Sequence, residues 1–369
     1  TILAVPPVIT LIQADLNLSG TEIGILNGLP VVLFAAVALP GALLIARFGA
    51  LTTLVVGLLV TGVGSVLRGA SGSVVILFAT TILTGAGVAL MQPAMPPMVR
   101  QWLPSRIGFG TAVYTNGLLV GETLPVALTL PLLLPLLGGW GWGFAAWGAP
   151  CILIALALLF FAPRTEKSAA VASAPARWWP DWRDGLIWRL SFLLGAVNAM
   201  YFCTNAFLPG YLTSQARADL ISPALTALNT GQLPASFLLL AIASRLERRA
   251  WPFVLMGVLS IGSVVGMVLT ASAWTVFFAA VLGFAAAAVL ALALALPPLL
   301  YAPADVPRTS AAMFTISYGG AMVISVVAGA AWDVTGSAAF AFLPIALAGL
   351  PLVLIAPMID LSRRSGTAG

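Results

Sequence analysis

Long apolar runs, interrupted by charged and turn-forming residues, make up most of this chain. A helix that crosses a membrane needs about 20 apolar residues. The runs predict twelve spans, near 1–12, 22–46, 51–67, 74–98, 107–134, 142–162, 188–208, 222–244, 251–270, 275–300, 309–331 and 337–359. The first run is too short to cross, so we expect a truncated first helix. The pattern predicts an all-α membrane protein.

Composition supports this prediction. Of 369 residues, 61% are hydrophobic and only 7% are charged, whereas a soluble domain is about 25% charged. The chain has no His, which removes the usual proton shuttle and the commonest metal ligand. No nucleophile lies beside a base, so we expect no enzyme activity, no metal and no cofactor.

The basic residues indicate an orientation. If the spans alternate sides, 14 of the 16 Lys and Arg residues fall on one side, and only Arg68 and Arg217 fall on the other. Cytoplasmic loops carry an excess of Lys and Arg, so both termini are expected to be cytoplasmic. The high pI then reflects these loops, and we expect no nucleic-acid partner.

A polar segment divides the chain into two similar halves. It is rich in Ala, Ser and Pro and predicts a cytoplasmic linker at 164–187, between six-helix bundles at 1–163 and 188–369. Its end, "RWWPDWRDGLIW", is expected to form a short helix on the membrane surface. The segment "PPVITLIQADLNLSG" of the first half corresponds to "LPGYLTSQARADLISP" of the second half. In the same way, "IARFGA" corresponds to "ASRLERRA". Duplicated halves with a site between them are typical of transporters.

The short basic loop after the second span resembles the signature G-x-L-x-D-R-x-G-R-R of the major facilitator superfamily. Leu44, Arg47 and Gly49 match it, while Ala46 stands where the acid should be. The second half repeats the basic residues but also lacks the acid. The resemblance implies the superfamily's fold of two pseudo-symmetric six-helix bundles, and gating roles for these loop residues: Arg47, Gly49, Arg245, Arg248 and Arg249.

Within that superfamily the chain is most similar to the cyanate permease and nitroimidazole transporter group. The likeness is carried by "PPVITLIQADLNLS", "NGLPVVLF", "QPAMPPMVRQWLP", "GTAVYTNGLLVG" and "FLPGYL". Gly108, Gly117 and Gly121 also have the spacing of the antiporter motif of drug exporters, but Glu122 replaces its proline. We therefore expect Gly117-x3-Gly121 to allow close approach of a neighbouring helix.

Polar side chains within the spans are the candidates for a substrate site, although such groups also join helices to one another. Asn198, Tyr201 and Asn205 recur at i, i+3 and i+7 and so share one helix face. The other candidates are Gln92, Gln232, Asn229, Asn27, Tyr114 and Tyr318.

Glu122 is the sharpest feature, because it is the only charged residue between Ile107 and Pro163. An acid at mid-membrane costs roughly 2.5–3.5 kcal/mol on insertion scales, and no basic residue lies inside a span away from its ends. We expect Glu122 to carry a proton or bind a cation, with a hydrogen bond to a neighbouring helix as the alternative. The lack of an Arg or Lys in mid-span argues against strongly anionic substrates.

These features predict a secondary transporter of the bacterial cytoplasmic membrane that works by alternating access. We expect a monomer in the lipid bilayer, driven by the proton gradient, with a small neutral or weakly basic substrate. The alternatives are a proton/drug efflux antiporter, a small-anion permease resembling those for cyanate, and a receptor that does not transport.

Overall fold

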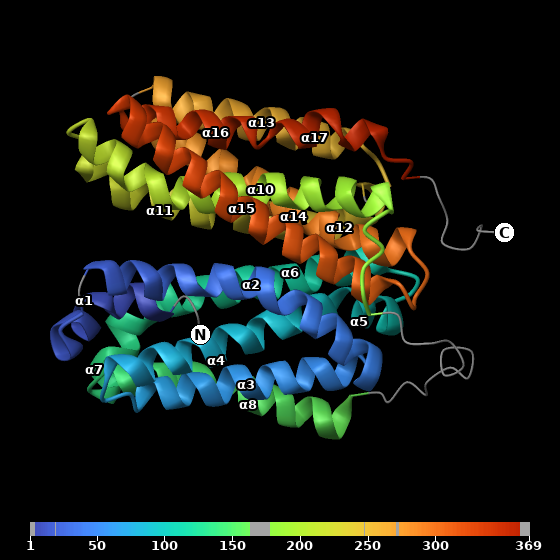
Figure 1. The fold of residues 1–369 in the computed structure, drawn as a ribbon, viewed down its shortest axis with the longest axis horizontal. Helices are drawn as coiled ribbons and strands as arrows, with labels where there is room; N and C mark the ends of the chain where they lie inside the picture. The colour runs from blue at the N-terminus through green and yellow to red at the C-terminus, as the bar shows by residue number, and fades with distance from the viewer. Residues whose placement is uncertain (1–3, 19, 163–177, 247, 271–272, 362–369) are drawn as a thin grey trace.

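Helices account for most of the chain in the computed structural model, which describes residues 4–18, 20–162, 178–246, 248–270 and 273–361 (Figure 1). The first half contains α1 (Val5–Leu16), α2 (Gly20–Phe48), α3 (Ala50–Gly69), α4 (Val74–Met91), η2 (Gln92–Ala94), α5 (Met95–Trp102), α6 (Ile107–Leu128), η3 (Thr129–Leu133), α7 (Leu134–Leu137) and α8 (Trp140–Phe161). The second contains α10 (Gly185–Ser214), η4 (Ala218–Leu220), α11 (Ile221–Thr230), α12 (Gln232–Leu246), α13 (Trp251–Leu269), α14 (Ala273–Leu300), α15 (Val306–Thr335), η5 (Ala338–Ala341), α16 (Phe342–Leu347), α17 (Leu350–Leu354) and η6 (Ala356–Met358).

Local sequence signals explain several helix boundaries. Gly49 joins α2 to α3 at φ 90°, and Gly336 follows α15 at φ 67°, a region that glycine enters without a steric cost. The Asp184 carboxylate accepts a hydrogen bond of 2.9 Å from the backbone N–H of Leu186 and so caps the start of α10. Glycines at positive φ and a capping carboxylate thus mark where these helices end and begin.

Nine helices in the described part of the chain are long and apolar enough to cross a membrane. They are Ala50–Gly69, Val74–Trp102, Trp140–Phe161, Gly185–Ser214, Pro223–Ala243, Trp251–Leu269, Ala273–Leu300, Val306–Thr335 and Ala338–Met358. The other three expected spans correspond to α1, which is short, to α2, whose apolar part is Val32–Phe48, and to α6. The α6 pass changes at Thr129–Leu133 into a π-helical turn, where Pro131 removes a backbone donor.

The expected surface helix at the end of the linker is not present. Residues 178–184 form turns instead, and α10 begins at Gly185. Pro180 opposes a helix here because it lacks an N–H and restricts the residue before it. The indoles of Trp178, Trp179 and Trp182 pack in series, with ring centroids 5.2 and 6.1 Å apart.

The helices form two groups, which Figure 1 shows as a lower bundle of α1–α8 and an upper bundle of α10–α17. Glycines permit close contacts inside the lower bundle. A Cβ atom at Gly62 of α3 would lie 3.0 Å from the carbonyl oxygen of Gly148 in α8. Small residues allow helices to approach in this way in membrane proteins, where van der Waals packing drives association.

The two bundles meet along a defined set of helices. Helix α2 packs against α15, and α6 packs against α12 and α14. At one end, Val99, Ile107, Ala295 and Leu299 form a buried apolar cluster shared by α5, α6 and α14. Five elements lie toward the opposite end, namely α1, η3, α7, α11 and α16. Each of them makes its main contacts with other helices of its own half. The interface is therefore closed at the end where α5 stops and α6 begins.

Candidate functional site

A hydrogen-bonded cluster of amides and a phenol links α10 to the following pass. The Tyr201 hydroxyl donates to Asn229 Oδ1 at 2.6 Å and accepts from Gln232 Nε2 at 3.1 Å. Asn229 Nδ2 in turn donates to Asn205 Oδ1 at 3.1 Å. These four predicted site residues thus form one network, with Tyr201 at its centre. A network of this kind fixes the positions of its members, because each depends on its neighbours.

Tyr318 of α15 lies at the junction of the two bundles. Its hydroxyl accepts a hydrogen bond from Gln92 Nε2 of the opposite bundle at 3.2 Å. Its ring centroid lies 5.1 Å from that of Phe34 in α2 and 6.0 Å from that of Phe202 in α10. One turn earlier, Thr315 Oγ1 donates to the Ala35 carbonyl of α2 at 3.1 Å. Gln92 and Tyr318 are therefore hydrogen-bonded across the interface, and the rings of Phe34 and Phe202 pack against Tyr318.

Glu122 of α6 faces the same region. Its carboxyl interacts electrostatically with the hydroxyls of Tyr201 and Tyr318, both of which belong to the opposite bundle. The side chain is half-buried. No hydrogen bond or ion pair connects it to another residue in the described ranges. Glu122 is thus a carboxyl between the bundles that has no Arg or Lys partner among the residues described.

Unsatisfied polar atoms gather near this junction. The Tyr114 hydroxyl and Gln92 Oε1 are buried and make no hydrogen bond, and the same holds for Ser236 Oγ in α12. Tyr114 also interacts electrostatically with Tyr318. A buried polar group without a partner costs about 1–3 kcal/mol. These atoms can therefore accept or donate new bonds to a molecule that enters between the bundles.

Two other candidates do not join this cluster. Asn198 Nδ2 donates to Ser317 Oγ at 2.8 Å, so it connects α10 to α15 within one bundle and is separated from Tyr201 and Asn205, with which it was expected to act. Helix α10 packs against both α15 and α11, so polar residues along it can bond to different neighbouring helices. Asn27 was also a candidate, and its side chain lies outside the described residues.

The prediction that a neighbouring helix packs closely against Gly117-x3-Gly121 is wrong. A Cβ atom built at either glycine would have no heavy atom within 4 Å, and both residues are exposed. The spacing puts the two glycines on one face of α6, but that face does not meet a helix. The glycines therefore leave open space on α6 immediately before Glu122.

The closed end of the interface depends on Arg100, which the sequence interpretation counted only as a loop charge. Its guanidinium Nη1 donates across the interface to the carbonyl oxygens of Pro298 and Tyr301, the latter at 2.7 Å. The Tyr301 hydroxyl donates to Asp184 Oδ2 at 2.5 Å. Burial, followed by the hydrogen bond to Asp184, raises the pKa of Tyr301, so this phenol stays protonated and remains a donor.

A repeat in the sequence could have revealed this contact. "MPPM" at 95–98 and "LPPL" at 296–299 are 201 residues apart, close to the repeat length of the two halves. The two Pro-Pro segments end equivalent passes, and in the structure these ends meet. Arg100 is at the position that corresponds to Tyr301, so each half supplies one member of the contact.

The loop residues expected to take part in gating lie elsewhere. The side chains of Arg47, Arg245 and Arg249 are exposed, and Arg248 Nη1 donates to Leu361 within its own half at 3.4 Å. Gly49 serves as the turn between α2 and α3. In the described residues the bundles are therefore bridged at this end by Arg100, not by these loops.

Arg68 is a further buried cation at the end of α3. It is 1% exposed, its guanidinium lies 5.1 Å from the ring centroid of Phe144, and its nitrogen atoms make no hydrogen bond. Cation–π contact stabilises a guanidinium over an aromatic face. Arg68 takes no part in the hydrogen bonds around Tyr201 and Tyr318.

Comparison with known proteins identifies the family. The sequence model of the Major Facilitator Superfamily matches residues 2–228, which is more than half of the chain. The chain belongs to this superfamily. The sequence resemblance and the expected fold class are thus confirmed, and the protein is a multi-pass membrane protein of a transporter family.

Three known transport proteins are similar to this chain over part of their length. The chain is 27% identical to the uncharacterized transporter YycB of Bacillus subtilis (strain 168), over 67% of this chain and 61% of the relative. It is 27% identical to the 2-nitroimidazole transporter of Escherichia coli (strain K12), over 58% and 54%. It is 25% identical to the cyanate transport protein CynX of the same organism, over 67% and 64%. The chain thus spans between half and two thirds of these relatives.

A solved structure supports the fold of the superfamily over nearly the whole chain. The proton:xylose symporter XylE, bound to 6-bromo-6-deoxy-D-glucose, superposes with a TM-score of 0.72 at 14% identity, covering 97% of this chain and 92% of XylE. This likeness concerns the arrangement of helices alone. At this identity the likeness carries no information on the side chains around Tyr201, Tyr318 and Glu122.

Proposed function

We propose that this protein is a proton-coupled secondary transporter that moves a small, neutral or weakly basic organic molecule across the bacterial cytoplasmic membrane, with both termini cytoplasmic. Membership of the superfamily supports transport by alternating access, in which two bundles rock around a site between them. The observation that carries the coupling is Glu122, a carboxyl between the bundles without an Arg or Lys partner in the described part of the chain.

The substrate would bind where the two halves meet. Tyr201 and its amide network form one side, and Tyr318 with Gln92 forms the other. Aromatic rings provide flat apolar contact area, while amides and phenols fix orientation by hydrogen bonds. The unpaired Gln92 Oε1 and Tyr114 hydroxyl offer further bonds, and the relative named for 2-nitroimidazole supports a small planar substrate.

Glu122 would change its charge during the cycle. An ionised carboxylate is disfavoured in a dry interface and favoured once water reaches it. Separation of the bundles at either end changes this access, so proton binding and release follow the conformational change. A protonated Glu122 makes the interface easier to close, which couples the proton gradient to movement of the bundles.

Charge at the cluster disfavours an anion as the main substrate. The described residues that contact Tyr201 or Tyr318 contain amides, hydroxyls and rings but no Arg or Lys, and an anion that approached Glu122 would also be repelled. The relative named for cyanate keeps a small-anion permease as the second candidate. Net flux out of the cell would instead indicate an efflux antiporter on the same fold.

Uptake into proteoliposomes tests this proposal. With an imposed pH gradient, we expect the wild-type protein to accumulate 2-nitroimidazole more strongly than cyanate, and Glu122→Gln to lose the dependence on the gradient. Asp333→Asn is the matched control, because Asp333 is an exposed acid of α15. Preference for cyanate would contradict the proposed substrate class, and unchanged gradient-driven uptake by Glu122→Gln would contradict the role of this residue.

A further inference from the structure

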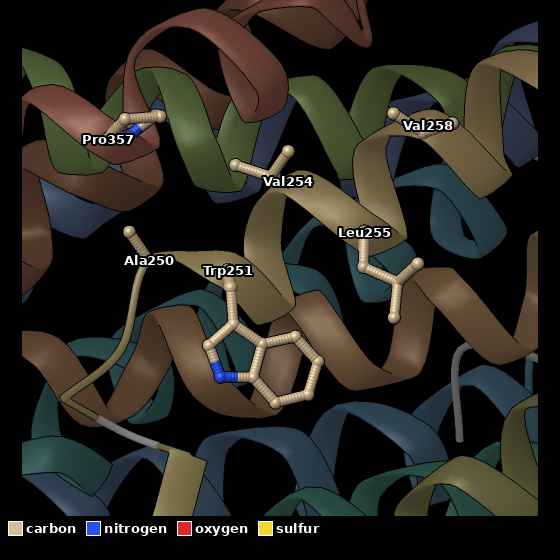
Figure 2. A pocket seen from close by; sticks show the side chains of 6 residues that line it. All are labelled: Ala250, Trp251, Val254, Leu255, Val258 and Pro357. Carbon is tan, nitrogen blue, oxygen red and sulfur yellow. The ribbon is translucent and has the colours of Figure 1, made fainter.

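A shallow hollow lies on the outer surface of the second bundle, away from the polar cluster. It is lined by Ala250, Trp251, Val254, Leu255 and Val258 at the start of α13 and by Pro357 of η6 (Figure 2). None of the predicted substrate-site residues lines it. The hollow is therefore separate from the proposed substrate site.

The lining is apolar and open to the surroundings of the protein. Trp251 is 51% exposed, Leu255 44% and Val258 55%, while Ala250 and Val254 are half-buried. Because α13 is one of the helices able to cross the membrane, this surface faces lipid. An apolar hollow on such a surface fits an acyl chain better than it fits a polar solute.

Arginines lie around one end of the hollow. Arg249 immediately precedes Ala250, and Arg189 Nη1 donates to the carbonyl oxygen of Met358, next to Pro357, at 3.2 Å. Arg248 reaches the carbonyl oxygen of Leu361, and all three arginine side chains are exposed. The exposed acid nearby among the described residues is Asp360. The charges favour an anion at this end.

Tryptophans place this end of the hollow at the membrane surface. Trp251 belongs to the first turn of α13, and Trp188, next to Arg189, is 39% exposed. Indole rings concentrate at the level of lipid headgroups, where their apolar face and polar N–H are both accommodated. The arginines are thus at headgroup depth, and the rest of the hollow extends along α13 at acyl-chain depth.

We propose that this surface is a specific site for one anionic glycerophospholipid. An acyl chain lies along Val254 and Val258 in the hollow, and the phosphate binds Arg189 and Arg249. With the orientation expected from the basic loops, the site faces the cytoplasmic leaflet. Arginine suits the headgroup because its planar guanidinium can donate two parallel hydrogen bonds to phosphate oxygens.

Native mass spectrometry of the purified full chain tests the site. The protein is mixed with equal amounts of phosphatidylglycerol and phosphatidylcholine that carry the same acyl chains. We expect the wild type to retain phosphatidylglycerol preferentially. The double variant Arg189→Gln/Arg249→Gln should lower this preference roughly thirtyfold, because each Arg near the membrane surface contributes about a fivefold preference for an anionic lipid. Arg106→Gln, which removes an exposed arginine of the other bundle, should retain the wild-type preference.

A second measurement locates the acyl chain. Phosphatidylglycerol with brominated acyl chains should quench Trp251 fluorescence, measured as the difference between wild type and Trp251→Phe, and Val254→Trp should displace this lipid by filling the hollow. Equal retention of the two lipids by the wild type would overturn the proposal. So would an equal loss in Arg106→Gln, which would indicate diffuse attraction, or displacement by inorganic phosphate, which would remove any role for the hollow.

Discussion

Arg100 gives the most direct prediction about the closed end of the bundle interface. Replacing it by Gln removes the charged donor from the Pro298 and Tyr301 carbonyls. Hydrogen bonds to a charged group contribute about 1.5–3 kcal/mol each. Arg100 is only half-buried, so solvent screening reduces this sum, and we take about 2 kcal/mol for the pair. The ratio of closed to open molecules should then fall roughly thirtyfold.

Electron–electron double resonance can measure this shift in populations. Spin labels at Gln101 and Ala304, both exposed, report the separation of the two bundles at this end, after Cys151 and Cys203 are replaced. We expect Arg100→Gln to add a longer distance to the distribution, while Arg106→Gln leaves the distribution unchanged. An Arg100→Gln distribution identical to the wild type would refute the inference that this contact holds the bundles together.

Three further predictions concern the cluster and the helix packing. Tyr201→Phe removes the centre of the amide network and should raise the KM for 2-nitroimidazole uptake about tenfold, as expected for roughly 1.4 kcal/mol; an unchanged KM would place the substrate elsewhere. Asn198→Ala should lower the Tm but leave that KM unchanged, because its amide bonds Ser317 within one bundle. Gly62→Ala should lower the Tm, since overpacking costs about 1–3 kcal/mol. Gly117→Ala should leave the Tm unchanged, because there is open space around Gly117. An equal loss of Tm in the two variants would contradict the packing described.

The helices were largely predictable because lipid imposes a simple rule on length and polarity. Apolar runs bounded by Gly, Pro and charge set most passes. The rule fell short at Thr129–Leu133, where prolines turn an apparently continuous run into a π-helical segment, and at Pro180, which prevents the expected surface helix.

The candidate site was predictable in its residue types but not in its partners. Polar side chains inside apolar spans identified Tyr201, Tyr318 and Glu122. Which of them meet depends on helix rotation and on packing between the halves, and a single sequence does not encode these in a local pattern. Gly117 shows the same limit, because its spacing suits close packing although its face is open. Arg100 was missed because charge near a span end suggests a loop, whereas here it caps a helix of the other bundle.

Glu122 is the group that we propose couples proton movement to substrate movement. The direct test is a pH-sensitive dye inside proteoliposomes, recorded while 2-nitroimidazole is added without an imposed gradient. We predict that substrate flux through the wild type changes the internal pH, and that Glu122→Gln exchanges substrate at a comparable rate with no pH change. A Glu122→Gln protein that still moves protons with its substrate would contradict the central claim.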